Sequence, residues 1–337
     1  MGRRIGICPT LIEPALVDFL REQGLARARE RGTWTPLSGG VSSDIWHVQT
    51  SRGEFCVKRA LAQLKVAADW SAPVERNAVE WAYLEVATKI APGSVPRPIA
   101  HDPGRGLFAM AWLAPDRHKL WKTELLADRA DPGFAAGVGH LVGRIHAATH
   151  RDPATPANFA TDASFHALRL DPYIRATAEK HPDLAERLEA IVEATASTRL
   201  VLVHGDVSPK NILIGPDGPV LLDAEVAWFG DPAFDLAFCL NHLVIKARVV
   251  DGAPDGLLES FDALAGAYRG HIAWEEPETL EARAAALLPA LALARVDGKS
   301  PLEYLDEAQQ AALRIASRAA LKAGPRTLQH AKALLSA

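Results

Sequence analysis

The chain has 337 residues, of which 48% are hydrophobic and 23% charged, and its formal net charge is −4 at pH 7. This composition is typical of a globular protein long enough for two domains. A slightly acidic chain argues against nucleic acid or an anionic membrane as the main partner, because both of these select basic surfaces. We therefore expect a small-molecule partner.

Cysteine usage and apolar runs exclude several other classes of protein. Cys8, Cys56 and Cys239 lie far apart and form no CxxC pair, which predicts buried thiols and neither disulfides nor a zinc site. The longest strongly apolar run, residues 284–294, is too short to cross a bilayer and contains Pro289. The N-terminal sequence lacks the apolar core of a signal peptide. We expect a cytoplasmic protein without membrane contact.

The first third of the chain alternates between helical and extended patterns. Residues 10–30 space their apolar side chains as an amphipathic helix does, and residues 33–60 read as three strands separated by turns. Residues 74–91 return to helical spacing and end at a Pro-Gly pair. The segment VPRPIAHDPGRGLFAMAWL then predicts two strands about a DPGRG turn. This order predicts a small antiparallel sheet that carries one main helix, over residues 1–113.

Helical patterns dominate from about residue 115 onward, and only residues 200–203 and 211–223 read as extended. We therefore expect a larger, mostly helical lobe over residues 114–337, which makes an α+β chain of two lobes with a ligand site between them. The expected helical segments are residues 133–150, 177–197, 232–249, 256–270, 277–294 and 303–335.

The extended segments of the second lobe carry an unusual set of polar residues. The sequence VLVHGDVSPKNILIGPDGPVLLD predicts strand, loop, strand, turn and strand, with Asp206 and Asn211 in the loop and Asp223 at the end of the last strand. Such a hairpin brings three oxygen-bearing side chains to one end. Carboxylate and amide oxygens are ligands of Mg²⁺ in sites that also hold substrate phosphates. Each residue alone could be a solvated loop residue, but the three together predict a metal and phosphate site.

The motif HGDVSPKN, followed by LLDAEVAWFGDPAFDLA, resembles the HGDxxxxN and D-x-E/D signatures of the aminoglycoside phosphotransferase and choline kinase group. These are small-molecule kinases with a protein-kinase-like fold. The DAE triplet and the segments VERNAVEWAYLEVATKIAPGSVPRPIAHD and LARVDGKSPLEYL are similar to methylthioribose kinases. The resemblance covers nearly the whole chain, and it implies ATP and Mg²⁺ as cofactors.

The resemblance implies a role for each residue of the motif. Asp206 is expected to accept the proton of the substrate hydroxyl as the γ-phosphoryl group is transferred. Asn211 and Asp223 are expected to bind Mg²⁺. Glu225 matches the family's second acid and is expected to contact metal or water, with a bare surface carboxylate as the alternative. His204 is expected to hold the loop through hydrogen bonds and not to transfer protons.

Three further residues near the motif need separate interpretations. Asp235 lies in a helical pattern, so we expect a buried acid that accepts backbone N–H groups of the loop, and not a third metal ligand. Ser208 stands where many antibiotic kinases of the group have His, and Lys210 stands where Gly is common. Lys210 is expected either to neutralise the γ-phosphate or to be solvated.

The first lobe is expected to bind the nucleotide's phosphates. A glycine-containing turn between its first two strands allows backbone N–H groups to approach phosphate oxygens, although ordinary hairpins share this feature and the GxGxxG spacing is absent. Lys58, near a strand end, can reach the α- and β-phosphates, and Glu80 on the next helix stands where the family has its ion-pairing glutamate. Glu75 is the alternative acid. The turn residues expected to contact phosphate are Ser38, Gly39, Gly40 and Ser42.

Together these features predict an ATP-dependent phosphotransferase that acts on a hydroxyl group of a small molecule. Sugar-like acceptors come first because of the resemblance to methylthioribose kinases. An aminoglycoside or choline-like acceptor would need an acidic pocket, for which residues 275–278 (EEPE) offer acids but read better as a helix start. A catalytically inactive nucleotide-binding module is a further alternative. A protein kinase is disfavoured, because HGD replaces HRD and DAE replaces DFG. The sequence leaves the acceptor, the nucleotide base and the oligomeric state open.

Overall fold

The computed structural model describes residues 13–37, 43–61, 76–250 and 254–337. The chain divides into two compact units. The N-terminal unit comprises Met1–Trp81 and Arg97–Leu113, and the C-terminal unit comprises Ala82–Pro96 and Ala114–Ala337. Helix α2 (Arg76–Ile90) contributes residues to both units.

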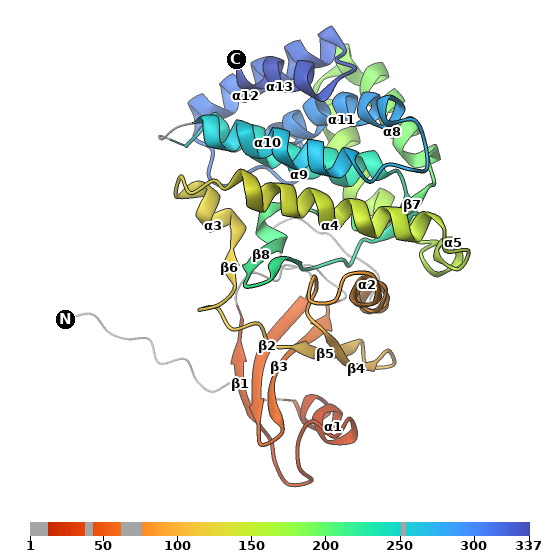
Figure 1. The fold of residues 1–337 in the computed structure, drawn as a ribbon, viewed down its shortest axis with the longest axis vertical. Coiled ribbons are helices and arrows are strands. Elements are labelled where there is room, and N and C mark those ends of the chain that lie inside the picture. The colour runs from red at the N-terminus through yellow and green to blue at the C-terminus, as the bar shows by residue number, and fades with distance from the viewer. Residues whose placement is uncertain (1–12, 38–42, 62–75, 251–253) are drawn as a thin grey trace, which may run out of the picture. The chain divides into compact units, whose positions relative to one another are not determined.

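A five-stranded antiparallel sheet, with strand order β1-β2-β3-β5-β4, forms the N-terminal unit (Figure 1). Tight turns join β2 to β3 and β4 to β5, and this explains why these neighbours in sequence are neighbours in the sheet. The predicted strands, their two turns and their antiparallel pairing are confirmed. The strands are β1 (Thr33–Pro36), β2 (Ser43–Thr50), β3 (Gly53–Ala60), β4 (Pro98–Asp102) and β5 (Leu107–Ala111).

Helix α1 (Pro14–Glu22) packs its apolar stripe against this sheet. Its buried Phe19 and Leu20 join a core that includes Val48 and Val57 from the strands. Burying side chains of this size contributes roughly 1.5 to 3 kcal/mol each. The helix is shorter than the periodicity of residues 10–30 predicts. Gly24, with φ of 70°, follows its last turn and allows the chain to leave the helix.

The C-terminal unit is mostly helical, as predicted. Its α-helices are α3 (Trp121–Leu126), α4 (Pro132–His150), α5 (Thr155–Asn158), α6 (Asp162–Phe165), α7 (Ala176–Lys180), α8 (Ala185–Ser197), α9 (Pro232–Ala247), α10 (Pro254–Arg269), α11 (Pro277–Asp297), α12 (Glu307–Ala323) and α13 (Leu328–Ser336). Helix α9 lies at the centre, since every residue from Pro232 to Lys246 is buried. Helices α10 and α11 pack against it, α4 packs on α10, and α12 and α13 pack on α11 (Figure 1).

Two predicted helices are interrupted in the structure. The segment 303–335 is two helices, because Gly324 takes a left-handed conformation (φ 67°) after α12 and Pro325 follows it. The segment 177–197 is divided by a short 3-10 turn, η2 (Pro182–Leu184). Proline cannot supply the backbone N–H that a continuous helix needs at this point.

Short strands flank the HGD loop. Strand β7 (Val201–Val203) pairs with β10 (Trp228–Gly230), and β8 (Ile212–Gly215) pairs with β9 (Gly218–Leu221) and with β6 (Lys119–Leu120). The expected extended segments at 200–203 and 211–223 are therefore confirmed. Strands β6 and β10 were not predicted, because two or three residues carry no periodicity and the pairing itself makes them strands.

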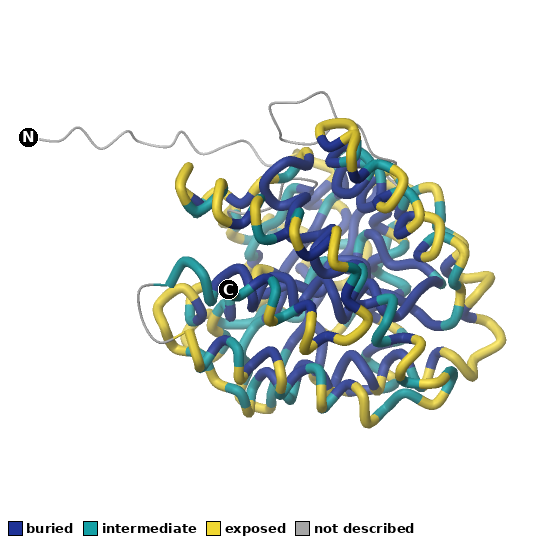
Figure 2. The backbone as a smooth tube through the Cα atoms, turned by 90° about the horizontal axis from the view of Figure 1, so that it is seen from above, coloured by how far each residue is buried: buried dark blue, intermediate teal, exposed yellow. Residues whose placement is uncertain are grey.

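The outer helices bury one face inside the molecule and expose the other to solvent. Figure 2 shows buried backbone inside the helical part of the chain and exposed turns around its outside. Cys56 and Cys239 are buried free thiols, as predicted, and burial raises the pKa of Cys56 to about 12. Among the helices within the described ranges, none is both long enough and apolar enough to cross a membrane.

Candidate active site

The loop that carries HGD depends on a glycine. Gly205 has φ of 78°, in the left-handed region that favours glycine. A Cβ atom at this position would lie 2.8 Å from the carbonyl oxygen of Val226. Any side chain would therefore displace backbone that packs against the loop. The flanking His204 and Asp206 are 1% and 3% exposed, so the loop is buried and its polar groups need internal partners.

A carboxylate on α9 supplies two of these partners. Asp235 accepts the N–H of His204 at 2.7 Å and the N–H of Gly205 at 2.8 Å. The Nε2 atom of His146 on α4 lies 3.3 Å from the same carboxylate. The expectation that Asp235 is a buried acid that accepts loop N–H groups is confirmed.

His204 is a buried imidazole that holds the loop. Its Nδ1 accepts the N–H of Asp206 at 3.2 Å, so in the neutral ring Nε2 carries the proton. Its ring meets Tyr83 edge-on, with centroids 5.0 Å apart. Burial lowers the pKa of His204, although the carboxylates of Asp235 and Asp206 oppose this effect. The predicted role of His204 in holding the loop is confirmed.

Asp206 is a buried carboxylate held between two cations. Its Oδ2 lies 3.0 Å from the guanidinium of Arg169 and 3.1 Å from the ammonium of Lys210. Burial alone would raise the pKa of Asp206, but Lys210 and Arg169 outweigh burial and hold the pKa below its ordinary value. A carboxylate that stays ionised at neutral pH can orient a hydroxyl group and accept its proton.

Arg169 is the main residue of this site that the sequence did not reveal. It lies on a π-helix, η1 (His166–Arg175), and its Nε donates to the carbonyl of Gly205 at 2.5 Å. Its guanidinium lies 5.9 Å from the ring centroids of both Tyr173 and Phe238. π-helical turns are rare and frequent at functional sites, but no residue pattern announces one. Arg169 thus joins η1 to the HGD loop.

The three expected metal ligands lie around the same charges. Asn211 donates from Nδ2 to the carbonyl of Asp206 at 3.2 Å, which fixes the plane of its amide. Asp223 and Glu225 are half-buried, and both act electrostatically on the guanidinium of Arg169. Asp223 has φ of 67°, a conformation that residues other than glycine seldom adopt and that often marks a functional position.

The donors of this site suit a hard cation. Asn211, Asp223 and Glu225 offer amide and carboxylate oxygens, which favour Mg²⁺ over zinc. Across the described parts of the chain, no three His, Cys, Asp and Glu side chains make a ready-built metal cluster. A kinase site does not require one, because Mg²⁺ is held there by one or two carboxylates together with phosphates and waters. The residues present therefore fit the metal that the sequence predicted.

The N-terminal unit contains the predicted ion pair. Lys58 Nζ, on β3, lies 2.6 Å from Glu80 Oε2, on α2, and each side chain is 3% exposed. A buried charge is costly without its partner, so each of the two residues depends on the other. The contact is confirmed, and its role toward a nucleotide stays a prediction. Glu75 and the turn residues Ser38, Gly39, Gly40 and Ser42 lie outside the described residues.

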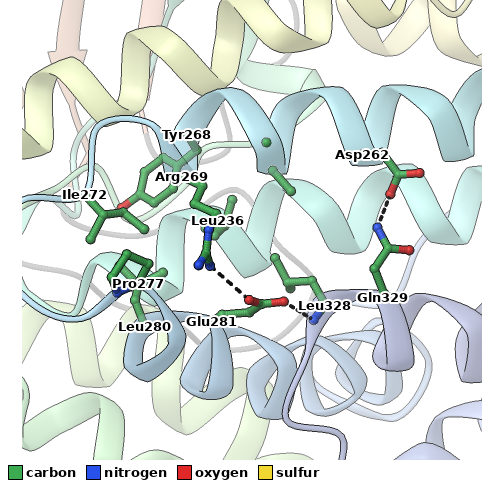
Figure 3. A pocket seen from close by; sticks show the side chains of 12 residues that line it. Leu236, Asp262, Tyr268, Arg269, Ile272, Pro277, Leu280, Glu281, Leu328 and Gln329 are labelled. Atoms are coloured by element: carbon green, nitrogen blue, oxygen red, sulfur yellow. Dashed lines mark hydrogen bonds and ion pairs between the residues drawn. The ribbon is translucent and has the colours of Figure 1, made fainter.

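A separate cavity of about 190 Å³ lies between α10, α11 and α13 (Figure 3). Its polar side chains are paired with one another, since Arg269 lies 3.2 Å from Glu281 and Gln329 donates to Asp262 at 2.7 Å. None of the predicted site residues lines it. Its apolar lining residues include Leu236, Ile272, Leu280 and Leu328.

Comparison with known sequences gives matches along most of the chain. Residues 33–277 match the phosphotransferase enzyme family (APH). The chain is 21% identical over 282 residues to methylthioribose kinase 2 of Oryza sativa subsp. japonica, a match that covers 73% of this chain and 65% of that protein. It is 25% identical over 282 residues to the methylthioribose kinase of Pectobacterium atrosepticum, covering 75% of this chain and 69% of the relative.

Solved structures share the fold. A choline/ethanolamine kinase family protein from Mesorhizobium loti aligns with a TM-score of 0.53 at 17% identity, covering 96% of this chain and 98% of that one. The amicoumacin kinase hAmiN, in complex with AMP-PNP, Ca²⁺ and Ami, aligns with a TM-score of 0.56 at 14% identity, covering 88% and 90%. The predicted α+β fold, with an antiparallel sheet in one unit and helices in the other, is that of these kinases.

Proposed function

Since the chain belongs to the phosphotransferase enzyme family, we propose that it is an ATP-dependent kinase of small molecules. It transfers the γ-phosphoryl group of Mg-ATP to a hydroxyl group of its acceptor. The observation that carries this proposal is the buried carboxylate of Asp206, kept ionised by Lys210 and Arg169 at the end of the HGD loop. The methylthioribose kinases among its relatives, and the AMP-PNP bound to the amicoumacin kinase, support the same reaction class.

In this reaction Asp206 acts on the acceptor hydroxyl. Its carboxylate accepts the hydroxyl's hydrogen bond and then its proton, while the hydroxyl oxygen bonds to the γ-phosphorus and the bond to the β,γ-bridging oxygen breaks. ADP leaves with that oxygen. Lys210, whose side chain is 50% exposed, can turn from Asp206 toward the γ-phosphate and neutralise part of its charge. Phosphoryl transfer of this kind depends mostly on positioning and charge, so no nucleophilic side chain is needed.

The remaining site residues receive roles toward the nucleotide. Mg²⁺ would neutralise the phosphates, held by Asn211 and Asp223 with Glu225 as a further contact. The ammonium of Lys58, steadied by Glu80, would contact the α- and β-phosphates.

The metal assignment predicts a change in magnesium dependence. Asp223→Asn removes one charge, yet asparagine tolerates the left-handed backbone of this position, so the loop should keep its shape. In the wild type, Mg²⁺ should strengthen AMP-PNP binding by about tenfold or more, because all the proposed metal ligands are present. In Asp223→Asn, Mg²⁺ should strengthen AMP-PNP binding by much less. Calorimetry with and without Mg²⁺ measures the difference. Asp217→Asn, on the exposed β8–β9 turn, is the matched control, and equal dependence in all three proteins would contradict the assignment.

The acceptor class is the least determined part of the proposal. Similarity to methylthioribose kinases favours a sugar-like acceptor. An aminoglycoside or amino alcohol would need unpaired acids, but in the EEPE segment Glu275 lies 2.8 Å from Arg283 and Glu278 pairs with Arg269. Helix α11 begins at Pro277 within this segment, where a helix start was predicted, and these two acids pair with arginines of the fold.

A screen for ADP release tests the function itself. We expect Mg-ATP turnover that depends on a hydroxyl-bearing acceptor in a library of sugars, sugar acids, sugar phosphates, amino alcohols and aminoglycosides. The coupled assay reports ADP, and mass spectrometry of the product confirms an added phosphoryl group. A protein that binds Mg-ATP but transfers phosphate to no acceptor would support the alternative of an inactive nucleotide-binding module.

A further inference from the structure

Three cations of the C-terminal unit gather around two tyrosines. Lys246, near the end of α9, donates to the hydroxyl of Tyr304 at 3.1 Å, and its ammonium lies 4.9 Å from the centroid of that ring. Lys122 of α3 lies 5.6 Å from the same centroid. Arg295 of α11 donates to the hydroxyl of Tyr173 at 3.1 Å. We call Lys122, Lys246 and Arg295 the basic cluster.

The basic cluster is connected to the catalytic carboxylate by side-chain contacts. The guanidinium of Arg295 lies 5.5 Å from the ring centroid of Tyr173, and that of Arg169 lies 5.9 Å from the same centroid. Arg169 in turn lies 3.0 Å from Asp206. One aromatic ring and one guanidinium therefore separate the cluster from the residue that accepts the hydroxyl proton.

Among the residues that the structure describes, one carboxylate is paired with the three cations of the cluster. Within the described ranges, the carboxylate paired with it is Glu303, which contacts Lys122. Lys246 is 1% exposed and Arg295 is 7% exposed, yet their hydrogen-bond partners among the described side chains are neutral hydroxyl groups. The Nε of Arg295 is buried and has no hydrogen-bond partner in the part of the chain that the structure describes. Buried cations normally have carboxylate partners, so this arrangement lacks an anion.

The electrostatics of the surrounding groups agree with this deficit. Burial, together with the charges of Lys122 and Arg295, lowers the pKa of Lys246 to about 7, and Cys239 and Glu303 oppose this effect. Burial and the same cations also lower the pKa of His242. A position that served packing alone would be filled at less cost by a neutral side chain of similar volume. An anion beside Lys246 would restore its full charge.

We propose that the basic cluster binds an anionic group of the acceptor. The substrate is then a hydroxylated small molecule that also bears a carboxylate or a phosphate ester, and not a neutral sugar or an aminoglycoside. The guanidinium of Arg295 suits both anions, because its planar fork donates two parallel hydrogen bonds to their oxygens. The inference rests on the proposed kinase function. The anionic group takes no part in the transfer, and it positions the hydroxyl at Asp206.

Matched acceptors test the class of substrate. Each set has one carbon skeleton in four forms: sugar, sugar acid, sugar phosphate and amino sugar, for example ribose, ribonate, ribose 5-phosphate and an aminoribose, with the corresponding glucose set. We expect kcat/KM for an acid or a phosphate to exceed that of its neutral form by about tenfold or more, as for one charge-assisted contact. The acid and phosphate arms distinguish the two anions. Preference for a neutral or amino form would overturn the inference.

Variants of the basic cluster test whether these residues cause the preference for anionic acceptors. Anion binding is measured separately from turnover. Lys246→Met and Arg295→Met should lower acceptor kcat/KM by about tenfold or more while KM for ATP stays within about twofold. They should also abolish binding of inorganic phosphate or ribonate, measured by calorimetry without nucleotide. Lys332→Met is the matched control, because Lys332 lies 5.7 Å from the ring of Phe261 but has a carboxylate partner, Asp262, at 2.6 Å.

The possible outcomes separate the two proposals. A raised KM for ATP with unchanged use of the acceptor would assign the cluster to nucleotide phosphates and overturn the inference. Phosphorylation of neutral sugars without anion binding would also overturn it and leave the kinase function standing. Anion binding at the cluster without turnover of any acceptor would contradict the kinase function instead. Lys246→Met should not melt below the wild type, because it removes an unpaired buried charge; a large fall in its melting temperature would show a purely structural role.

Discussion

Replacing Asp206 by Asn should lower turnover by about a hundredfold or more while the affinity for Mg-ATP changes little. The substitution keeps the shape of the side chain but removes its charge and its ability to take the hydroxyl proton. The loss should fall on kcat and on kcat/KM for the acceptor alike, because the interaction is strongest in the transition state. Steady-state kinetics with saturating ATP and acceptor measure it.

The surroundings of Asp206 supply the controls for this experiment. Arg169 and Lys210 lose their anionic partner in Asp206→Asn, so circular dichroism and thermal unfolding must show that the loop still folds. Lys210→Met tests the second cation, and should weaken turnover less than Asp206→Asn if its task is to neutralise the γ-phosphate. An Asp206→Asn protein that folds and keeps most of its activity would remove Asp206 from the catalytic role.

The elements that the sequence predicted are those with strong local signals. The strands of the N-terminal sheet were predictable because they are short runs of strand-forming residues separated by turn residues. The HGD loop was predictable because its residues act within one short segment. Gly205 shows why a short motif was enough. Its left-handed backbone conformation and close neighbours favour glycine, and Asp206 is the next residue in the chain.

The positions of Arg169 and of the basic cluster follow from tertiary packing instead. Arg169, Lys246 and Arg295 come from three helical segments far apart in sequence, and helical periodicity shows which face is buried but not which distant residue it meets. The π-helical form of η1, which brings Arg169 to Gly205, has no pattern of its own. The left-handed backbone of Asp223 is likewise a property of the folded loop.

Glu80 was predictable for a different reason. Helix α2 follows β3 in a unit with few other elements, so the resemblance gave both the lysine and its partner in advance. The structure adds that the pair is nearly inaccessible to water, since each of the two side chains is 3% exposed. Burial makes the pair sensitive to the loss of either member, since the remaining charge is left uncompensated at a cost of about 3 to 5 kcal/mol. Any functional test of Lys58 must therefore separate folding from nucleotide binding.

A double-mutant cycle on Lys58 and Glu80 makes this separation. Lys58→Ala should strongly weaken ATP binding or turnover, because it removes the ammonium proposed to contact the α- and β-phosphates. Glu80→Ala should do so less, since it only frees the ammonium from its position. The double variant should use ATP little worse than Lys58→Ala, because the effects of two residues that act as one unit do not add. It should also lose less stability than the two single variants lose in sum, because no unpaired charge remains.

Adenosine and an exposed lysine complete the design of this cycle. Adenosine has no phosphates, so it should bind all variants about equally, and a folded variant that fails to bind it has lost more than a phosphate contact. Lys89→Ala, at the exposed end of the same helix α2, should behave as the wild type in every assay. If Lys58→Ala binds and uses ATP as well as the wild type, or if the two single effects on ATP simply sum, the pair does not serve the nucleotide. The phosphate contacts would then come from another cation, and Lys210 and Arg59 are the next residues to replace.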